Sequence, residues 1–295
     1  MGSLTDDSMH EAWLDGRGGV RIFARLWDAH GSPRASIVIC HGVNSHSGQY
    51  ARAATVFAER GFAVTALDLR GRRRSEGERF YVESIDDYVS DLSQAIELAR
   101  SRHPGLPLYL LGHSAGGVVA CTYALDHQDR LSGLICESFA LHVYAPDVAL
   151  KLVEGASHII PHVHVLKLKN RDFSRDPEWV ATLDADPLTQ GEVQPVQTVA
   201  ALARAGERLE REFVKLTLPL LILHGTADKA TRPDGSQLML DSVGSPDREL
   251  KLYDGYYHDL LNDLGHERVV DDITRWIEAR LPNAHPYQPD MPIAT

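Results

Sequence analysis

The stretch Leu110-Leu111-Gly112-His113-Ser114-Ala115-Gly116-Gly117 decides the fold of this chain. It contains the pattern Gly-x-Ser-x-Gly, entered from the apolar run 107–111 and followed by the small-residue segment 118–124. A serine on a tight turn from a strand into a helix sits at strained backbone angles, and the flanking glycines let strand and helix approach each other closely. The hydroxyl then projects from the edge of a sheet, above a helix N-terminus that stabilises negative charge. The stretch therefore predicts that Ser114 is a nucleophile.

Short apolar runs alternate with helical patterns on both sides of this turn. Strands are expected at 20–27, 37–40, 62–67, 108–111, 131–136, 218–223 and 249–253, and helices at 50–60, 85–102, near 236–242 and near 267–281. This rhythm predicts an α/β fold, in which helices cover both faces of a mostly parallel central sheet.

The rhythm stops between residues 139 and 211, where histidines, prolines, charges and scattered aliphatic residues show no clean strand. An insertion at the edge of such a sheet is the expected place for a lid. We therefore divide the chain into a core segment 1–138, a lid insertion 139–211, a second core segment 212–281 and a tail 282–295. The tail contains four prolines and is expected to be poorly ordered.

The composition is that of an ordinary globular protein, with 43% hydrophobic and 24% charged residues among 295. The net charge of −11 argues against a nucleic-acid partner, because such proteins present a basic face. No apolar run is long enough for a transmembrane helix, and the first residues lack the features of a secretory signal. Cys40, Cys121 and Cys136 lie in apolar stretches, as buried free thiols do. We expect a cytoplasmic protein, whose oligomeric state the sequence leaves open.

A serine nucleophile needs a histidine to take its proton and a carboxylate to orient that histidine. In folds with this serine turn the chain order is serine, acid, histidine, and the last two each follow a late strand. Asp228 follows the expected strand 218–223, and His258 follows the expected strand 249–253. Ser114, Asp228 and His258 are therefore the candidate catalytic residues.

An oxyanion hole needs two backbone N–H groups directed at the oxygen of the tetrahedral intermediate. One comes from the residue after the nucleophile, Ala115. The other is expected from the loop after an early strand, where Ile39-Cys40-His41-Gly42-Val43 places Val43 just after a glycine. Val43 and Ala115 are the candidate donors.

From about residue 20 to 281 the chain resembles the monoacylglycerol lipase and lysophospholipase group of α/β-hydrolases. The resemblance rests on His41-Gly42, His46-Ser47-Gly48-Gln49-Tyr50, Ser75-Glu76-Gly77, Pro104-Gly105-Leu106-Pro107, Gly112-His113-Ser114-Ala115-Gly116-Gly117, Ser174-Arg175-Asp176-Pro177, Asp186-Pro187-Leu188, His224-Gly225-Thr226-Ala227-Asp228 and Tyr257-His258. It implies the α/β-hydrolase fold, the same three catalytic residues, the same two oxyanion donors and a reaction without a cofactor.

Three positions depart from the relatives that select monoacylglycerols. By the same resemblance, those relatives carry a Glu in the loop after His-Gly, an Arg before the Tyr and a polar residue three positions after the catalytic His, all of which bind glycerol hydroxyls. This chain has Ser45, Gln49 and Leu261 at those positions. A site that binds hydroxyls by hydrogen bonds discriminates strongly, so their replacement favours broader ester use, although Ser and Gln can still bind a hydroxyl.

The family pattern Gly-His-Gly-x-Ser is replaced by Gly71-Arg72-Arg73-Arg74-Ser75. These arginines either bind an acidic group of the substrate or form a solvated loop paired with nearby acidic residues. In the insertion, His158, His162 and His164 have a spacing that suits metal ligands, but no Cys or acidic residue completes the set. No metal is expected.

The insertion also carries aliphatic side chains, namely Val143, Val148, Leu152, Val153, Ile159 and Ile160. Ile159 and Ile160 are candidate substrate contacts, because such residues can line a tunnel for an acyl chain. Alternatively they pack the lid onto the core. Transient contact with a membrane surface is a further interpretation, which the acidic net charge disfavours.

The sequence thus predicts a serine hydrolase whose partner is a small-molecule ester with a medium or long acyl chain. A broad carboxylesterase or lysophospholipase remains an alternative, including action on polyesters, thioesters or amides. A non-catalytic protein that binds acyl ligands is the alternative from another class, although every catalytic position is filled here.

Overall fold

The computed structural model describes residues 9–282. The strands are β1 (Met9–Asp15), β2 (Arg21–Trp27), β3 (Ala35–Cys40), β4 (Phe62–Leu67), β5 (Leu108–His113), β6 (Gly133–Glu137), β7 (His164–Leu166), β8 (Gln194–Pro195), β9 (Leu220–Gly225) and β10 (Arg248–Tyr253). The helices are α1 (Ala51–Glu59), α2 (Ile85–Arg102), α3 (Ala115–His127), α4 (Asp147–Ala156), α5 (Pro177–Ala185), α6 (Val196–Glu212), α7 (Pro233–Ser242) and α8 (His266–Glu278).

Eight strands form one sheet in the order β1-β2-β4-β3-β5-β6-β9-β10. Only β1 and β2 run antiparallel to their neighbours, and from β4 to β10 all pairs are parallel. The central strands β3, β4, β5, β6 and β9 are buried along their whole length. This is the pattern expected where helices cover both faces of a parallel sheet. The predicted α/β-hydrolase fold is confirmed.

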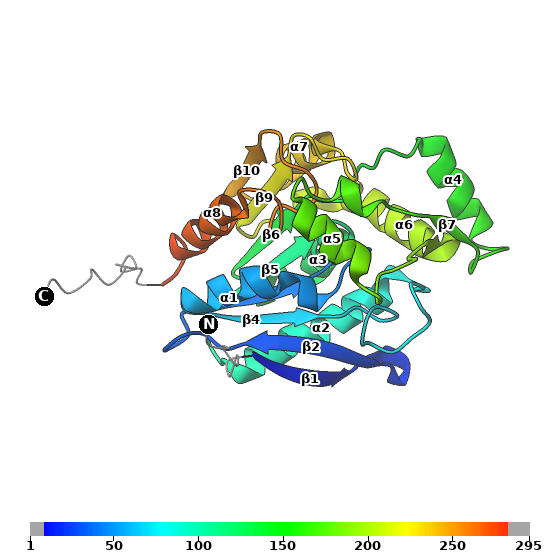
Figure 1. Ribbon diagram of the computed structural model, residues 1–295. Helices are drawn as coiled ribbons and strands as arrows, with labels where there is room; N and C mark the ends of the chain where they lie inside the picture. Colours follow the sequence, from blue (N-terminus) through cyan, green and yellow to red (C-terminus); the bar gives the residue numbers. More distant parts are fainter. Residues whose placement is uncertain (1–8, 283–295) are drawn as a thin grey trace, which may run out of the picture.

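Each face of the sheet has its own core cluster. On one face α1 and α8 contribute apolar side chains such as Phe57 and Ile273. On the other face α2, α3 and α6 contribute residues such as Leu92, Val119 and Leu209. Figure 1 shows α1 and α8 together on one side of the strands and α2 and α3 on the other. Because the strands from β4 to β10 are parallel, their carboxyl ends lie at one edge of the sheet, where the loops that follow them meet.

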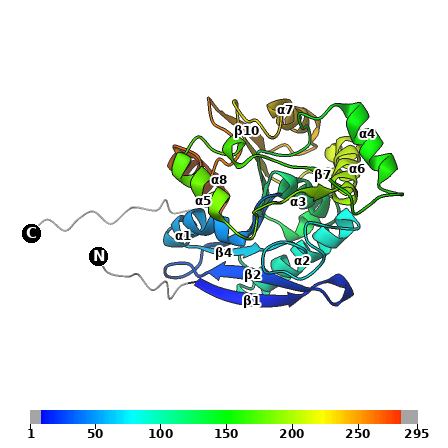
Figure 2. The ribbon, with the colours of Figure 1, turned by 45° about the vertical axis from the view of Figure 1, so that its right-hand side comes forward.

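The insertion 139–211 contains more regular structure than its sequence pattern indicates. Two short strands, β7 and β8, pair antiparallel within it. Its last part forms α6, whose Ala201, Ala205 and Leu209 are buried in a core cluster with α2 and α3. Small residues at helical spacing let α6 pack on the core, so the part of the insertion that stands outside the core ends before this helix. Figure 2 shows α4 and β7 beside α6.

Several local features can be compared with the sequence pattern. The pattern does not predict β1, since as an edge strand it has only a weak alternation of buried and exposed residues. Cys40, Cys121 and Cys136 are buried and free, as expected. Residues 283–295 of the expected tail lie outside the described residues. No helix within 9–282 is both long enough and apolar enough to span a bilayer.

Candidate active site

Ser114 lies on a sharp turn between β5 and α3. Its backbone angles are φ 55° and ψ −121°, which are rare for a residue with a side chain and carry strain of about 1–3 kcal/mol. It is the N-cap residue of α3, so the first free N–H groups of that helix lie next to its hydroxyl. Only 4% of Ser114 is exposed. The local structure is that expected of an activated serine.

Asp228 and His258 follow β9 and β10, and the structure brings them together. The Nδ1–H of His258 donates to Oδ2 of Asp228 at 2.8 Å, and both side chains are buried. The other carboxylate oxygen of Asp228 accepts the backbone N–H groups of Ala230 at 2.7 Å and Thr231 at 3.0 Å. The carboxylate is thus fixed in the orientation that receives the histidine.

The charge state of Asp228 follows from these neighbours. Burial by itself would raise the pKa of this carboxyl, but the electrostatic interaction with His258 and the hydrogen bonds from His224 and His258 hold the pKa well below its ordinary value. His224 lies at the end of β9, with its Nε2 atom 3.2 Å from Oδ2 of Asp228 and its Nδ1 atom 2.7 Å from the Ser236 hydroxyl. The sequence pattern did not predict that His224 contacts Asp228, although both residues belong to the motif His224-Gly225-Thr226-Ala227-Asp228.

The second nitrogen of His258, Nε2, is buried and has no hydrogen-bond partner among the described residues. The imidazole ring is confined by two aromatic neighbours, Phe173 at 5.1 Å and His113 at 4.9 Å between ring centroids. Since Nδ1 donates to a carboxylate, Nε2 carries the lone pair that can accept a proton.

The loop after β3 lies directly against the nucleophile. A Cβ atom on Gly42 would be 2.8 Å from Cβ of Ser114, so only glycine allows this approach. The Nδ1–H of His41 donates to the carbonyl oxygen of Gly42 at 2.6 Å, and Nε2 of His41 accepts the N–H of Leu69 at 3.0 Å. Burial lowers the pKa of His41 to about 4, so this pattern of one donor and one acceptor persists at neutral pH.

This hydrogen bond orients the Val43 N–H, one of the two candidate oxyanion donors. The Gly42 carbonyl and the Val43 N–H belong to one planar peptide and point in opposite directions. Holding the carbonyl at His41 therefore fixes the direction of the N–H. The other candidate, Ala115, is the first residue of α3, where backbone N–H groups lack partners within the helix.

The residues expected to contact substrate do not gather in one place. Ser45 and Gln49 are buried in the segment between β3 and α1. Leu261 lies inside the core cluster under α1 and α8, so its side chain packs with apolar residues of the interior. Ile159 is 82% and Ile160 44% exposed on the outside of the insertion. In this conformation, neither isoleucine lines a closed tunnel.

The three arginines each have an acidic partner. Arg74 pairs with Glu11 at 2.5 Å, and Arg73 lies 3.7 Å from Asp186. Arg72 is 2% exposed and forms an ion pair with Glu192 of the insertion. Arg72 is therefore neither part of a solvated loop nor a free cation for a substrate, because Glu192 already neutralises it.

Among the described residues, His158, His162 and His164 do not come together as a set of metal ligands. His162 instead contacts Glu78, with its Nδ1 atom 2.8 Å from the carboxylate.

A second group of buried polar side chains lies behind His258, and no sequence pattern pointed to it. His113, Glu137 and Asp259 place their polar atoms within 4.8 Å of one another. Burial raises the pKa of Glu137, and burial raises the pKa of Asp259 to about 6. Asp259 accepts the indole N–H of Trp179 at 2.9 Å, which ties α5 to the residue next to His258. The Asp259–Trp179 hydrogen bond links the insertion to the loop that carries His258, whereas Nε2 of His113 and Oε2 of Glu137 have no partner among the described residues.

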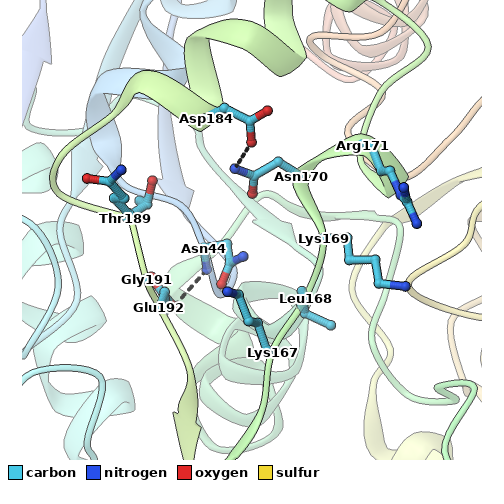
Figure 3. Close-up of a pocket in the computed structure, with 11 residues that line it drawn as sticks. Asn44, Lys167, Leu168, Lys169, Asn170, Arg171, Asp184, Thr189, Gly191 and Glu192 are labelled. Carbon is cyan, nitrogen blue, oxygen red and sulfur yellow. Dashed lines mark hydrogen bonds between the residues drawn. The ribbon is translucent and has the colours of Figure 1, made fainter.

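A pocket of about 560 Å³ opens between the insertion and the loop after β3. Figure 3 shows Asn44 on one wall and residues 167–171, 184 and 189–192 around it. Asn44 directly follows Val43, one of the two candidate oxyanion donors. Ser114, Asp228 and His258 do not line it.

Known proteins of one family are similar to this chain over most of its length. The family model described as serine aminopeptidase, S33, matches residues 31–265. A monoacylglycerol lipase from Mycolicibacterium smegmatis is 34% identical over 94% of this chain and 100% of that protein. A monoglyceride lipase from Homo sapiens is 32% identical over 90% of this chain and 89% of that protein. The crystal structure of a monoacylglycerol lipase from Paleococcus ferrophilus has a TM-score of 0.80 and 26% identity, and covers 88% of this chain and 99% of that one.

The family model, the relatives and the fold identify the chain as a serine hydrolase of the α/β-hydrolase class that acts on carboxylic esters. Within that class, the chain belongs to the serine aminopeptidase S33 family and, by its identity to full-length relatives, to the monoacylglycerol lipase group.

Proposed function

We propose that this enzyme hydrolyses esters with medium or long acyl chains, monoacylglycerols among them, through a covalent intermediate on Ser114. The observation that carries the proposal is made at one edge of the sheet, where a strained, buried serine follows β5 and a histidine whose Nδ1–H is held by Asp228 follows β10. The similarity to monoacylglycerol lipases over nearly the whole chain supports the substrate class.

Each side chain has a defined task in this reaction. Ser114 Oγ attacks the ester carbonyl while His258 Nε2 takes its proton, and Asp228 stabilises the resulting imidazolium. The N–H groups of Val43 and Ala115 donate to the oxyanion. His258 then protonates the leaving alcohol, and in the second half of the reaction it activates the water that releases the acid.

Ser45, Gln49 and Leu261 support a broader range of leaving groups than a strict monoacylglycerol lipase has. Leu261 offers no hydrogen bond from its side chain, and it is turned into the core. Lysophospholipids, polyesters, thioesters and amides stay as alternative substrates. An acyl-binding protein without activity stays as the alternative of another class.

We also propose that the insertion works as a lid, with 139–195 as its moving part, and that the protein acts in the cytoplasm. The low exposure of Ser114, 4%, supports this proposal, because a substrate needs an opening to reach the hydroxyl. Three buried free thiols support a reducing compartment.

Hydrolysis of p-nitrophenyl esters from acetate to palmitate tests the proposed function. We expect the rate to be highest for chains of eight or more carbons, and Ser114→Ala to lower it by about 10⁴-fold or more, because the nucleophile is lost. A maximum at acetate or butyrate would instead indicate a general carboxylesterase. No activity at any length would overturn the ester assignment.

The insertion carries an apolar surface that supports transient contact with lipid. Its large exposed residues are Tyr144, Val148, Leu152, Ile159, Ile160, Val163, Val165 and Leu166. Figure 1 shows α4 standing away from the sheet, with α6 as its neighbour. Val148 and Leu152 are one helical turn apart and 72% and 69% exposed. An amphipathic surface of this kind lies in a lipid interface through its apolar side.

We expect Val148→Ser with Leu152→Ser to slow hydrolysis of monoacylglycerol in lipid vesicles by about 10-fold, because the lost apolar area weakens surface binding. The rate on dissolved p-nitrophenyl butyrate should stay unchanged. Val214→Ser is the matched control, since Val214 is 66% exposed outside the insertion. Equal losses on both substrates, or none on vesicles, would contradict the lipid contact.

A further inference from the structure

Glu192 belongs to the insertion, yet its carboxylate reaches the loop that holds the candidate oxyanion donor. Its Oε1 atom accepts the backbone N–H of Asn44 at 2.8 Å, the dashed contact beside Asn44 in Figure 3. Asn44 is the residue after Val43. A side chain of the insertion therefore binds the main chain one peptide away from the oxyanion hole.

Glu192 is itself held in place by two further donors. Arg72 and the side-chain amide of Gln194 both donate to the same Oε1 atom, the amide at 2.6 Å. Arg72 also donates to Oε1 of Gln194 at 2.7 Å. The side chains of Arg72 and Glu192 are 2% and 1% exposed, so this charge pair is shielded from water. A buried acceptor with three donors has little freedom to move.

Asn44 has an unusual backbone conformation. Its φ is +54°, in the left-handed region that asparagine adopts more readily than most residues with a side chain. The side-chain Oδ1 atom of Asn44 is buried without a partner among the described residues. The bond to Glu192 is thus the contact that satisfies this N–H.

The two peptides on either side of Val43 are now both anchored. His41 holds the carbonyl of the Gly42–Val43 peptide, and Glu192 holds the N–H of the Val43–Asn44 peptide. Because peptides are planar, fixing both leaves Val43 little rotation about φ and ψ. The direction of the Val43 N–H depends on both contacts.

We propose that Glu192, neutralised by Arg72, is a positioning residue for the oxyanion hole of this enzyme. This rests on the proposed function, in which Val43 stabilises the oxyanion. Glu192 touches no reacting atom, and it acts through the Asn44 N–H. The contact also makes the oxyanion hole depend on the placement of the insertion.

Two double variants test the positioning role of Glu192 independently of its ion pair with Arg72. Removing only Glu192 or Arg72 would leave a buried charge alone and destabilise the fold. R72M with E192Q removes both charges but keeps an acceptor for the Asn44 N–H. R72M with E192L removes both charges and the acceptor. The two double variants differ only at position 192, where glutamine keeps and leucine lacks an acceptor for the Asn44 N–H and for the Gln194 amide.

We expect R72M/E192L to have a kcat about 10- to 100-fold below that of R72M/E192Q on a p-nitrophenyl ester, with KM within about threefold, because a displaced donor weakens only the transition state. The stability of both double variants is compared by urea unfolding. E207Q is the control, since Glu207 pairs with Lys151 on the surface. Equal kcat values for the two double variants would overturn the proposal.

Reaction of Ser114 with a fluorophosphonate provides a second readout that does not need an ester substrate. The phosphoryl oxygen occupies the oxyanion hole, so the labelling rate of R72M/E192L should fall below that of R72M/E192Q by a similar factor. If the wild-type chain is labelled but hydrolyses no ester, the proposed function fails and the labelling rates still decide the role of Glu192. A wild-type chain that does neither would overturn both.

Discussion

Asp228→Asn should lower kcat by about 10⁴-fold while the protein remains folded. The backbone N–H groups of Ala230 and Thr231 would hold the amide oxygen in the place of Oδ1. The amide NH₂ then takes the place of Oδ2 and points at Nδ1 of His258. Nδ1 must accept that hydrogen bond, so the proton moves to Nε2, which can no longer take the proton of Ser114.

The measurement is steady-state hydrolysis of p-nitrophenyl octanoate, with circular dichroism to verify folding. Asp234→Asn is the matched control, because Asp234 is an exposed aspartate that pairs with Arg232 and His142 at the start of α7. We expect the control to keep the wild-type rate. A loss of less than about 10-fold in Asp228→Asn would show that another carboxylate orients His258.

Gly116→Ala should destabilise the protein by about 3 kcal/mol or more and lower the activity by about 100-fold. A Cβ atom at this position would lie 2.2 Å from the carbonyl oxygen of Cys40 and 2.4 Å from that of His41. Both contacts are with main chain, so the start of α3 and the end of β3 must separate. That movement displaces Ser114 from the Val43 N–H.

Urea unfolding of the wild-type protein and the Gly116→Ala variant gives the change in the free energy of unfolding. Ester hydrolysis by the same two proteins gives the change in rate. Gly155→Ala is the control, since Gly155 lies in α4 and a Cβ there meets no atom within 4 Å. Alanine favours a helix over glycine by about 1 kcal/mol, so the control should be neutral or slightly more stable. A stable, active Gly116→Ala variant would contradict the close approach.

The sequence alone was sufficient to predict the central sheet, its helices and the candidate residues Ser114, Asp228 and His258. These features depend on local patterns: apolar runs of strand length, apolar spacing in helices, and glycines around a serine. The structure places α2 and β4 at the expected residues and brings Asp228 and His258 into contact. Chain order sufficed because the carboxyl ends of parallel strands meet at one edge.

Other features needed the folded chain. The helical pattern of α6, with Ala201, Ala205 and Leu209 on one side, is present in the sequence but does not stand out among the residues of the insertion. Leu261 could not be placed from its spacing to His258, because only packing decides whether a loop side chain turns toward the site or the core. The outward position of Ile159 is likewise a property of how the insertion packs.

What the sequence determined by itself is the chemistry of this protein, because a nucleophile, a base and their turns are encoded within a few residues of each other or in a fixed order. Only the tertiary structure decided which side chains hold the loops of the candidate site in place. Glu192 lies 148 residues from Asn44, and Arg72 lies 120 residues from Glu192. No local pattern records such pairs, since burial and charge pairing depend on which distant segments the fold brings together.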